Sequence, residues 1–397
     1  MNLGVYIQAP FCQTKCTYCN FRTGVFSSGL YEPYVEAVCR EIQEVGRSRG
    51  QEVRKEGIDE VKTNAVADWL SDAVDTVYVG GGTPSLLAPA GLARMLAALR
   101  EAFRCEWREV TLEADPETIT REKAEAWRAA GFDRISLGAQ SFNDAELKAA
   151  GRMHRRADTH AAARILRDAG FVSLSFDLIA GLPHQTAESW EASLEGLLRL
   201  APEHISIYMM EIDEGSRLGR EVISLGTRYG APALPSDDQM AAFYERARER
   251  LAAAGYEHYE ISNWALPGRR SQHNSKYWRR KPYLGLGAGA HSFDGRTRWA
   301  NAHDPAAYVA AIQAGRLPRE QRDDVTTQQA LEEELFLGLR QLEGIDFARL
   351  ERQYNVDLRE RLAALRNDGL VEIEGQIVRL APGRLTVSNE VFVELLG

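Results

Sequence analysis

The chain has 397 residues, enough for one large domain and a small one. Of these residues 44 % are hydrophobic and 26 % charged, a composition typical of a soluble globular protein. Asp and Glu outnumber Lys and Arg by 57 to 48, and the resulting net charge of −9 argues against general binding of nucleic acid. No apolar run approaches the roughly 18 residues of a membrane-spanning helix, and no signal peptide is recognisable. We therefore expect a cytoplasmic protein without a membrane span, for which peripheral membrane contact remains open.

Short β-rich runs alternate with helical patterns along most of the chain. Strands are predicted at 3–8, 75–80, 109–114, 133–139, 172–180, 204–210 and, less clearly, 256–262. Helices are predicted at 31–47, 89–103, 121–130, 158–169, 187–199 and 237–254, and three of them end at a glycine followed by an apolar residue, namely Gly131, Gly170 and Gly255. Repeated βα units imply a parallel sheet covered by helices, and six or seven units fit a barrel or partial barrel better than an open sheet.

Two segments depart from this alternation. The polar segment 48–72 is long for a connection and is predicted to be an insertion. From about residue 305 helices follow one another, at 328–342 and 357–367, before a β-hairpin whose turn lies near Glu374 and Gly375. This order suggests a small winged-helix-like domain. Residues 346–397 contain seven Arg and nine Asp and Glu, so the domain lacks the excess of positive charge that DNA binding requires. We predict a core domain at 1–305 and a C-terminal domain at 306–397.

Three cysteines, Cys12, Cys16 and Cys19, follow the first predicted strand with the spacing C-x3-C-x2-C. Such a cluster is typical of metal binding in a reducing compartment, since a disulfide framework would be even in number and spread out. Three thiolates suit a 4Fe–4S cluster and leave one iron without a protein ligand. Zinc completed by a distant His is the alternative. Cys39 and Cys105 stand alone and are predicted to be ordinary thiols.

With Tyr18 before the third cysteine, this spacing resembles the signature of the radical S-adenosylmethionine (SAM) superfamily. The resemblance implies a full or partial (βα) barrel, a 4Fe–4S cluster on the three cysteines, and SAM bound at the open iron. In "VGGGTPS", Gly81, Gly82 and Thr83 resemble the family loop that holds the SAM amino group. Polar residues recur at successive strand ends on the same face, and the resemblance implies that they contact SAM: Glu113, Gln140, Arg152 and Asp177, with Tyr6 and Tyr18 as further candidates.

Within the superfamily, "YIQAPFC", "GGGTPS", "SLGAQSF" and "DLIAGLP" resemble the family that contains oxygen-independent coproporphyrinogen III oxidase. The oxidases have a further cysteine, as C-x3-C-x2-C-x-C, and a long N-terminal extension. Here Asn20 and Phe21 follow Cys19, and the chain starts almost at the first strand. Both differences favour the heme chaperone branch, HemW. One departure from the family is Gln8-Ala9-Pro10, where H-I-P is usual, and it involves no predicted cluster ligand.

The segment "HNSKYW", expected to be a loop at 273–278, matches the H-N-x-x-Y-W motif that this branch associates with heme. The resemblance implies a heme site formed by His273, Asn274, Tyr277 and Trp278. An imidazole can be an axial iron ligand, the two aromatic rings offer flat faces, and the following Arg279, Arg280 and Lys281 could pair with propionates. His291 is a second possible ligand. The alternative is a structural histidine in an aromatic-rich loop.

These features predict a heme chaperone that carries a 4Fe–4S cluster and SAM and delivers heme to an acceptor such as a respiratory enzyme, with a homodimer possible. No catalytic residue is assigned. The first rival is radical decarboxylation of coproporphyrinogen III, against which the missing cysteine argues. The second is a metal-stabilised regulator that acts through the C-terminal domain, against which the acidic balance of that domain argues.

Overall fold

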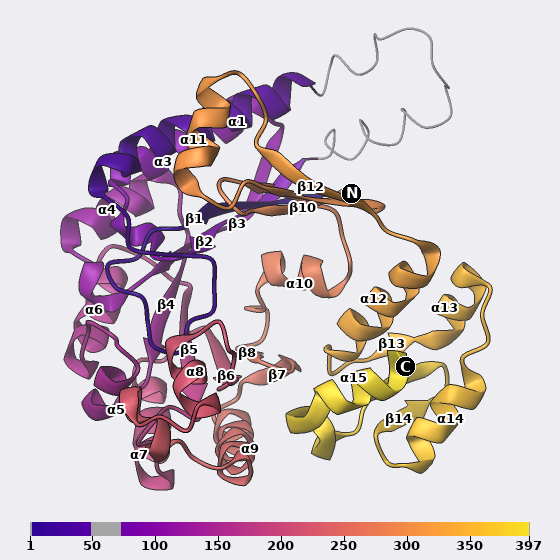
Figure 1. Cartoon of the computed structure of the whole chain (residues 1–397). Coiled ribbons are helices and arrows are strands. Elements are labelled where there is room, and N and C mark those ends of the chain that lie inside the picture. The colour runs from indigo at the N-terminus through magenta and orange to yellow at the C-terminus, as the bar shows by residue number, and fades with distance from the viewer. Residues whose placement is uncertain (1, 49–72, 397) are drawn as a thin grey trace, which may run out of the picture.

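The computed structural model describes residues 2–48 and 73–396. The predicted insertion at 48–72 lies, apart from its first residue, outside the described residues. Figure 1 shows a large α/β body and a smaller C-terminal lobe, with helix α10 between them. None of the helices in the described part of the chain is long and apolar enough to cross a membrane.

Six parallel strands form the centre of the body and pair in chain order, as they do in a partial barrel. They are β1 (Leu3–Ala9), β2 (Val74–Gly81), β3 (Cys105–Ala114), β4 (Arg134–Gln140), β5 (Leu174–Ala180) and β6 (His204–Met209). Their aliphatic side chains are almost fully buried, which is why most of these strands contain short apolar runs in the sequence. The predicted α/β partial barrel is confirmed.

The outer face of these strands is covered by six longer helices (Figure 1). They are α1 (Tyr31–Ser48), α3 (Pro89–Ala102), α4 (Arg121–Ala130), α6 (Arg156–Asp168), α7 (Ala187–Arg199) and α9 (Asp237–Ala253). Hydroxyl groups of Thr120, Thr186 and Ser236 cap the N-termini of three of them. Gly131, Gly170 and Gly255 have φ of 113°, 87° and 85°, so the predicted C′ glycines are confirmed.

Antiparallel and short strands extend the sheet to twelve strands, an extension that the sequence analysis did not predict beyond 256–262. One side adds β8 (Asn263–Ala265) and β7 (Glu257–Glu260), and the other adds β9 (Tyr283–Leu286), β10 (His291–Phe293), β11 (Thr297–Asn301) and β12 (Arg319–Asp324). The additional helices of the body are α5 (Asp144–Ala149), α8 (Arg217–Ile223), α10 (Gln272–Trp278) and α11 (Pro305–Gln313). Short 3-10 turns lie at Ser28–Leu30, Pro84–Leu86, Pro116–Thr118, Arg228–Ala233 and Pro382–Val387.

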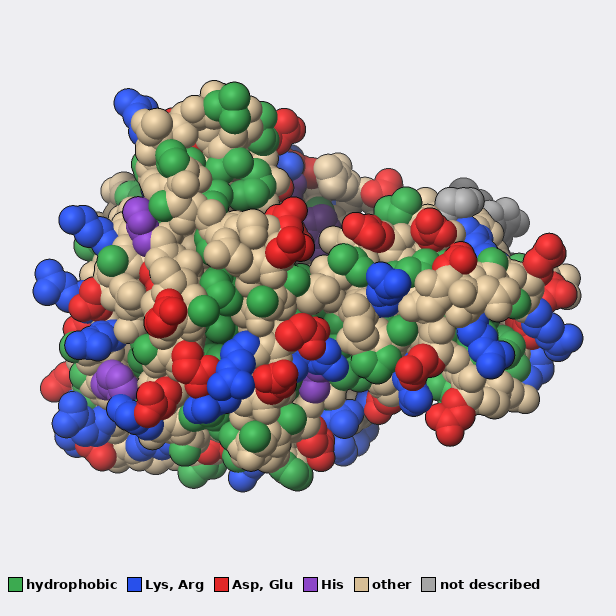
Figure 2. All heavy atoms as spheres, turned by 90° about the horizontal axis from the view of Figure 1, so that it is seen from below, with side chains coloured by type: hydrophobic (Ala, Val, Ile, Leu, Met, Phe, Trp, Pro, Cys, Tyr) green, Lys and Arg blue, Asp and Glu red, His purple; other side chains and the backbone are tan. Residues whose placement is uncertain are grey.

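The C-terminal lobe combines four helices with a small antiparallel sheet of order β13-β15-β14. In chain order it contains α12 (Thr327–Leu339), β13 (Ile345–Asp346), α13 (Phe347–Tyr354), α14 (Arg359–Asn367), β14 (Val371–Glu374), β15 (Ile377–Leu380) and α15 (Ser388–Leu396). The β14–β15 hairpin turns at Gly375, whose φ is 60°. Figure 2 shows acidic and basic side chains interspersed over the visible face of both lobes. The domain boundary at 305 stays a prediction, although β12 still pairs within the large sheet.

Candidate functional site

A cavity of about 500 Å³ opens at the carboxyl ends of the parallel strands, where βα folds build their chemistry. Cys12, Cys16 and Cys19 line it together. All but one of the residues predicted to contact SAM also line it: Tyr18, Gly81, Gly82, Thr83, Glu113, Gln140, Arg152 and Asp177. Tyr6 is the exception, because it lies inside the barrel, where its hydroxyl donates to Gln8 Oε1 at 2.8 Å and its ring stacks on Tyr78.

The cysteine loop is held against the glycine turn that follows β2. The Gly82 N–H donates to Ala9 O at 2.8 Å, and the Thr83 N–H donates to Phe11 O at 2.6 Å. A Cβ on Gly82 would lie 2.5 Å from Phe11 O and 3.0 Å from Cys12 Sγ, so only glycine allows this approach. The turn therefore fixes where the first cysteine enters the cavity.

Glu113, at the end of β3, is anchored by two donors. Its Oε2 accepts the Gly81 N–H at 2.9 Å, and its Oε1 accepts the Tyr78 hydroxyl at 2.8 Å. Burial raises the pKa of Glu113 to about 7, and burial also raises the pKa of Asp177 to about 6, despite its hydrogen bonds with Ser206 and Ser136. Both carboxyls can therefore change protonation near neutral pH when the cavity holds no cation.

Arg152 joins the cavity wall to the cysteines. Its side chain is 8 % exposed and forms an ion pair with Asp115. It also donates to Gly138 O at 2.9 Å, and its Nη1 lies 3.5 Å from Cys16 Sγ. Asp115 also accepts the Thr83 hydroxyl at 2.9 Å, and the sequence analysis overlooked it. Its position two residues after Glu113, which places both on one face of the chain, is the signal that could have identified it.

The donor set of this cavity fits an iron–sulfur cluster. The five cysteines are free thiols, and burial raises the pKa of Cys12 and Cys19, so those two stay protonated until a cation binds. Within residues 2–48 and 73–396, no three His, Cys, Asp or Glu side chains are gathered closely enough to hold a single ion. In a cubane each cysteine binds a different iron, so the three sulfurs need only surround the cluster.

The "HNSKYW" segment lies at the opposite ends of the strands and is not a loop. It forms α10, which packs against the beginnings of β2 and β3. The Ser271 hydroxyl accepts the Asn274 N–H, and Glu109 accepts the N–H groups of Gln272 and His273, both at 2.9 Å. The expectation of a loop is wrong because this carboxylate, more than 160 positions earlier in the chain, satisfies the first turn of the helix.

His273 points into the barrel and is 1 % exposed. Its Nδ1 lies 3.0 Å from the Thr76 hydroxyl and its Nε2 lies 2.9 Å from the Tyr277 hydroxyl, so both ring nitrogens have partners. The ring also packs on Tyr78, the residue that donates to Glu113. Burial lowers the pKa of His273 to about 3, which keeps the imidazole neutral.

The other motif residues face the C-terminal lobe or remain half-buried. The Arg340 guanidinium lies 4.7 Å from the centre of the Trp278 ring, and Gln341 donates to Trp278 O at 3.2 Å. The Trp278 indole N–H is buried without an acceptor among the described residues. Asn274 is half-buried on α10, and His291 stands apart on β10, beside His303. The structure thus separates the cysteine cavity from the "HNSKYW" helix, since Thr76 and Gly81 are five residues, or roughly 16 Å, apart along β2.

Comparison with known proteins identifies the families to which this chain is similar. Residues 6–197 match the model of the radical SAM superfamily, and residues 325–383 match the HemN C-terminal domain. The chain is 31 % identical to the heme chaperone HemW of Bacillus subtilis, covering 99 % of this chain and 98 % of that protein. It is 34 % identical to HemW of Mycobacterium tuberculosis, over 99 % and 95 % of the two chains, and 35 % identical to HemW of Synechocystis, over 93 % and 85 %.

Among solved structures, the coproporphyrinogen III oxidase HemN of Escherichia coli superimposes with a TM-score of 0.79 at 22 % identity. The match covers 100 % of this chain and 89 % of that one, and it establishes a shared fold. The motifs, the full-length relatives and the fold agree. The chain therefore belongs to the radical SAM superfamily and, within it, to the HemW group of the coproporphyrinogen III oxidase-like family.

Proposed function

We propose that the protein binds heme and transfers it to an acceptor protein, and that it carries a 4Fe–4S cluster with bound SAM. The observation that carries this proposal is the similarity, over at least 93 % of the chain, to proteins named heme chaperone HemW. The "HNSKYW" helix supports it, because this motif matches that branch. The cytoplasmic location, the homodimer and the identity of the acceptor stay predictions.

In this proposal Cys12, Cys16 and Cys19 would hold the cluster, and SAM would bind beside them in the same cavity. When bound, the reduced cluster supplies the electron that can cleave SAM. The protein around it has defined tasks: Gly81 and Gly82 let the backbone approach the SAM amino group, and Arg152 offers positive charge beside Cys16. Glu113 and Asp177 provide half-buried acceptors on the wall of the same cavity.

Heme would bind at α10, at the other end of the barrel from the cluster. His273 has a neutral imidazole that could ligate iron, but both of its nitrogens are engaged and the side chain is buried. Heme binding through His273 therefore requires α10 to move. Separation of the two sites would let an acceptor approach α10 while the cluster cavity stays occupied.

The test uses the full chain after anaerobic reconstitution of the cluster. We expect about four irons per chain, a hemin-induced Soret shift, and appearance of heme in a heme-free b-type acceptor. The Cys12→Ser variant should lose iron yet still bind hemin, and His273→Ala should lose the shift. A wild-type protein that binds no hemin would contradict the proposal.

The rival activity is oxidative decarboxylation of coproporphyrinogen III, and the shared fold with HemN does not decide between them. Incubation with coproporphyrinogen, SAM and a reductant separates the two functions. We expect no protoporphyrinogen, because Asn20 and Phe21 follow Cys19 where the oxidases have another cysteine. Accumulation of protoporphyrinogen would replace the chaperone proposal by the oxidase.

A further inference from the structure

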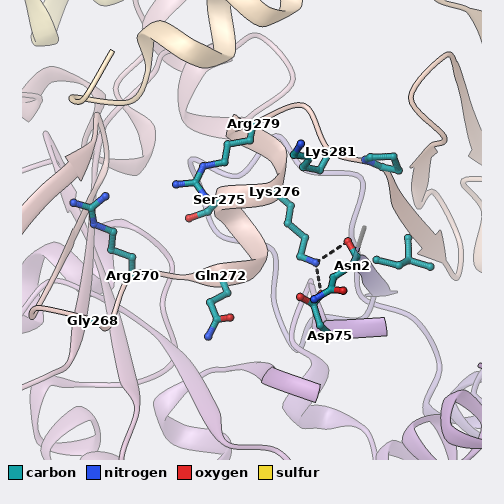
Figure 3. A pocket seen from close by; sticks show the side chains of 11 residues that line it. Asn2, Asp75, Gly268, Arg270, Gln272, Ser275, Lys276, Arg279 and Lys281 are labelled. Carbon is teal, nitrogen blue, oxygen red and sulfur yellow. Dashed lines mark hydrogen bonds and ion pairs between the residues drawn. The ribbon is translucent and has the colours of Figure 1, made fainter. Parts of the chain in front are cut away.

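A second cavity, of about 710 Å³, lies against α10 and shares no lining residue with the cysteine cavity. Figure 3 shows its walls: α10 and the residues after it contribute one side, and the beginnings of β1 and β2 contribute another. Its lining consists of Asn2, Leu3, Asp75, Gly268, Arg270, Gln272, Ser275, Lys276, Arg279, Lys281 and Pro282.

The cavity is positively charged although the whole chain is acidic. Four cationic side chains line it, Arg270, Lys276, Arg279 and Lys281, against one carboxylate, Asp75, so the lining carries 4 − 1 = +3 in a chain of net charge −9. The overall composition does not account for such a local excess. Converging cations with low-dielectric walls attract anionic groups.

These cations are not neutralised by strong partners. Lys276 alone is tightly engaged, with Asp75 and with Asn2 O (Figure 3). Arg270 reaches Glu257 and Glu343, each at 3.5 Å, and Arg279 reaches Glu343 at 3.6 Å. All four of these side chains are between 40 % and 55 % exposed, and ion pairs at such positions are weak. The exposed Lys281 ammonium has no partner among the described residues.

The residue types that line the cavity favour carboxylate groups over a flat aromatic ligand. No aromatic ring lines the cavity, and its apolar side chains are limited to Leu3 and Pro282, so it offers a macrocycle no flat surface. Arginine forks and lysine ammonium groups are suited to carboxylates. Tyr277 and Trp278, which do offer flat rings, stand on the same short helix.

We propose that this cavity binds the propionate carboxylates of the porphyrin, an inference that rests on the proposed heme-binding function. Arg279, Lys281 and Arg270 receive the carboxylates. Arg280, which the sequence analysis grouped with its neighbours, is excluded from this role because Glu333 accepts its Nε–H at 2.6 Å, away from the cavity.

Propionate binding would also act on the helix. A carboxylate in the cavity competes with Asp75 for Lys276, and the Lys276–Asp75 pair ties α10 to the start of β2. Weakening this pair loosens the helix that holds His273 against Thr76. Binding of a propionate would thus both hold the porphyrin at the cavity and favour the displacement of α10 that exposes His273.

The experiment compares the affinities of metal-free protoporphyrin IX and its dimethyl ester for the reconstituted full chain. Binding is measured by the quenching of protein fluorescence. The ester keeps the macrocycle and removes both negative charges. The test variant is Arg279→Gln with Lys281→Gln, and the matched control is Lys148→Gln with Arg164→Gln, two exposed cations on α5 and α6. Hemin titration of the wild type runs in parallel.

We expect the diacid to bind the wild type about tenfold more tightly than the ester, since two screened contacts of about 0.7 kcal/mol each give that factor. The test variant should lose this advantage, and the control should keep it. Equal binding of diacid and ester, or a test variant that behaves like the control, overturns the cavity proposal while hemin binding still supports the chaperone. If the wild type binds neither hemin nor porphyrin, both proposals fail.

Discussion

If His273 ligates heme iron as proposed, the Tyr277 hydroxyl competes with the iron for the imidazole, and removal of this hydroxyl is expected to strengthen heme binding. In the structure this hydroxyl lies 2.9 Å from His273 Nε2. That hydrogen bond must break before Nε2 can ligate iron. A buried hydrogen bond of this kind has a net value of about 1 kcal/mol. The variant Tyr277→Phe keeps the aromatic ring and should therefore bind hemin about fivefold more tightly.

The same change should destabilise the folded protein. It leaves a buried imidazole nitrogen without a partner, which costs about 1–3 kcal/mol in the free energy of unfolding. Hemin affinity is measured by Soret titration and stability by chemical denaturation. Tyr283→Phe is the matched control, because its hydroxyl bonds with Arg298 and does not contact His273.

The outcome that refutes this reasoning is specific. If Tyr277→Phe binds hemin more weakly than the wild type, the hydroxyl takes part in the bound state and does not restrain His273. If His273→Ala binds hemin with an unchanged Soret band, the iron ligand lies elsewhere, and His291 becomes the residue to test.

Three further predictions concern the scaffold. Gly82→Ala should lower the iron content after reconstitution and cost about 1–3 kcal/mol of stability, since its Cβ meets the cysteine loop, whereas Gly383→Ala, in open space, should do neither. Burial raises the pKa of Glu41 from 4.5 to about 7, so its contribution to stability is present below about pH 4.5 and is lost as pH rises through about 7. The free energy of unfolding of the wild type, measured by chemical denaturation, should therefore decline by up to about 3 kcal/mol over this range. The Glu41→Gln variant should lack this decline. Arg340→Met should cost about 3–5 kcal/mol by leaving the buried Glu260 unpaired, and adding Glu260→Gln should recover part of this loss; no recovery would contradict the pairing.

The parallel strands and their covering helices could be predicted because both signals are local. Buried strands read as apolar runs, and the glycines that end α4, α6 and α9 sit at positions where positive φ is required. The residues around the cysteine cavity could also be predicted, since the carboxyl ends of parallel strands meet at one edge. Asp115 was not predicted, because the contacts with Arg152 and Thr83 that place it at the cavity join residues distant in the sequence.

The helix α10 and the environment of His273 could not be predicted in this way. The helix depends on Glu109, which is distant in the sequence, and the histidine is closed in by Thr76 and Tyr277. Such contacts are set by the tertiary fold and leave no periodic pattern. The charged cavity beside α10 is of the same kind, because Asp75 and Lys276 lie about 200 positions apart in the sequence and are brought together by the fold.

The burial of His273 has a consequence for the speed of cargo exchange. If only molecules with a displaced α10 can ligate iron, hemin uptake follows conformational selection, and the apparent dissociation constant is the intrinsic one divided by the open fraction. An opening cost of about 2 kcal/mol would leave roughly one molecule in thirty competent at any moment. The association rate would then level off with rising hemin concentration, at the rate of helix opening. An acceptor that docks on α10 and holds it open would raise both the exchange rate and the apparent affinity for heme, while the intrinsic dissociation constant stays the same.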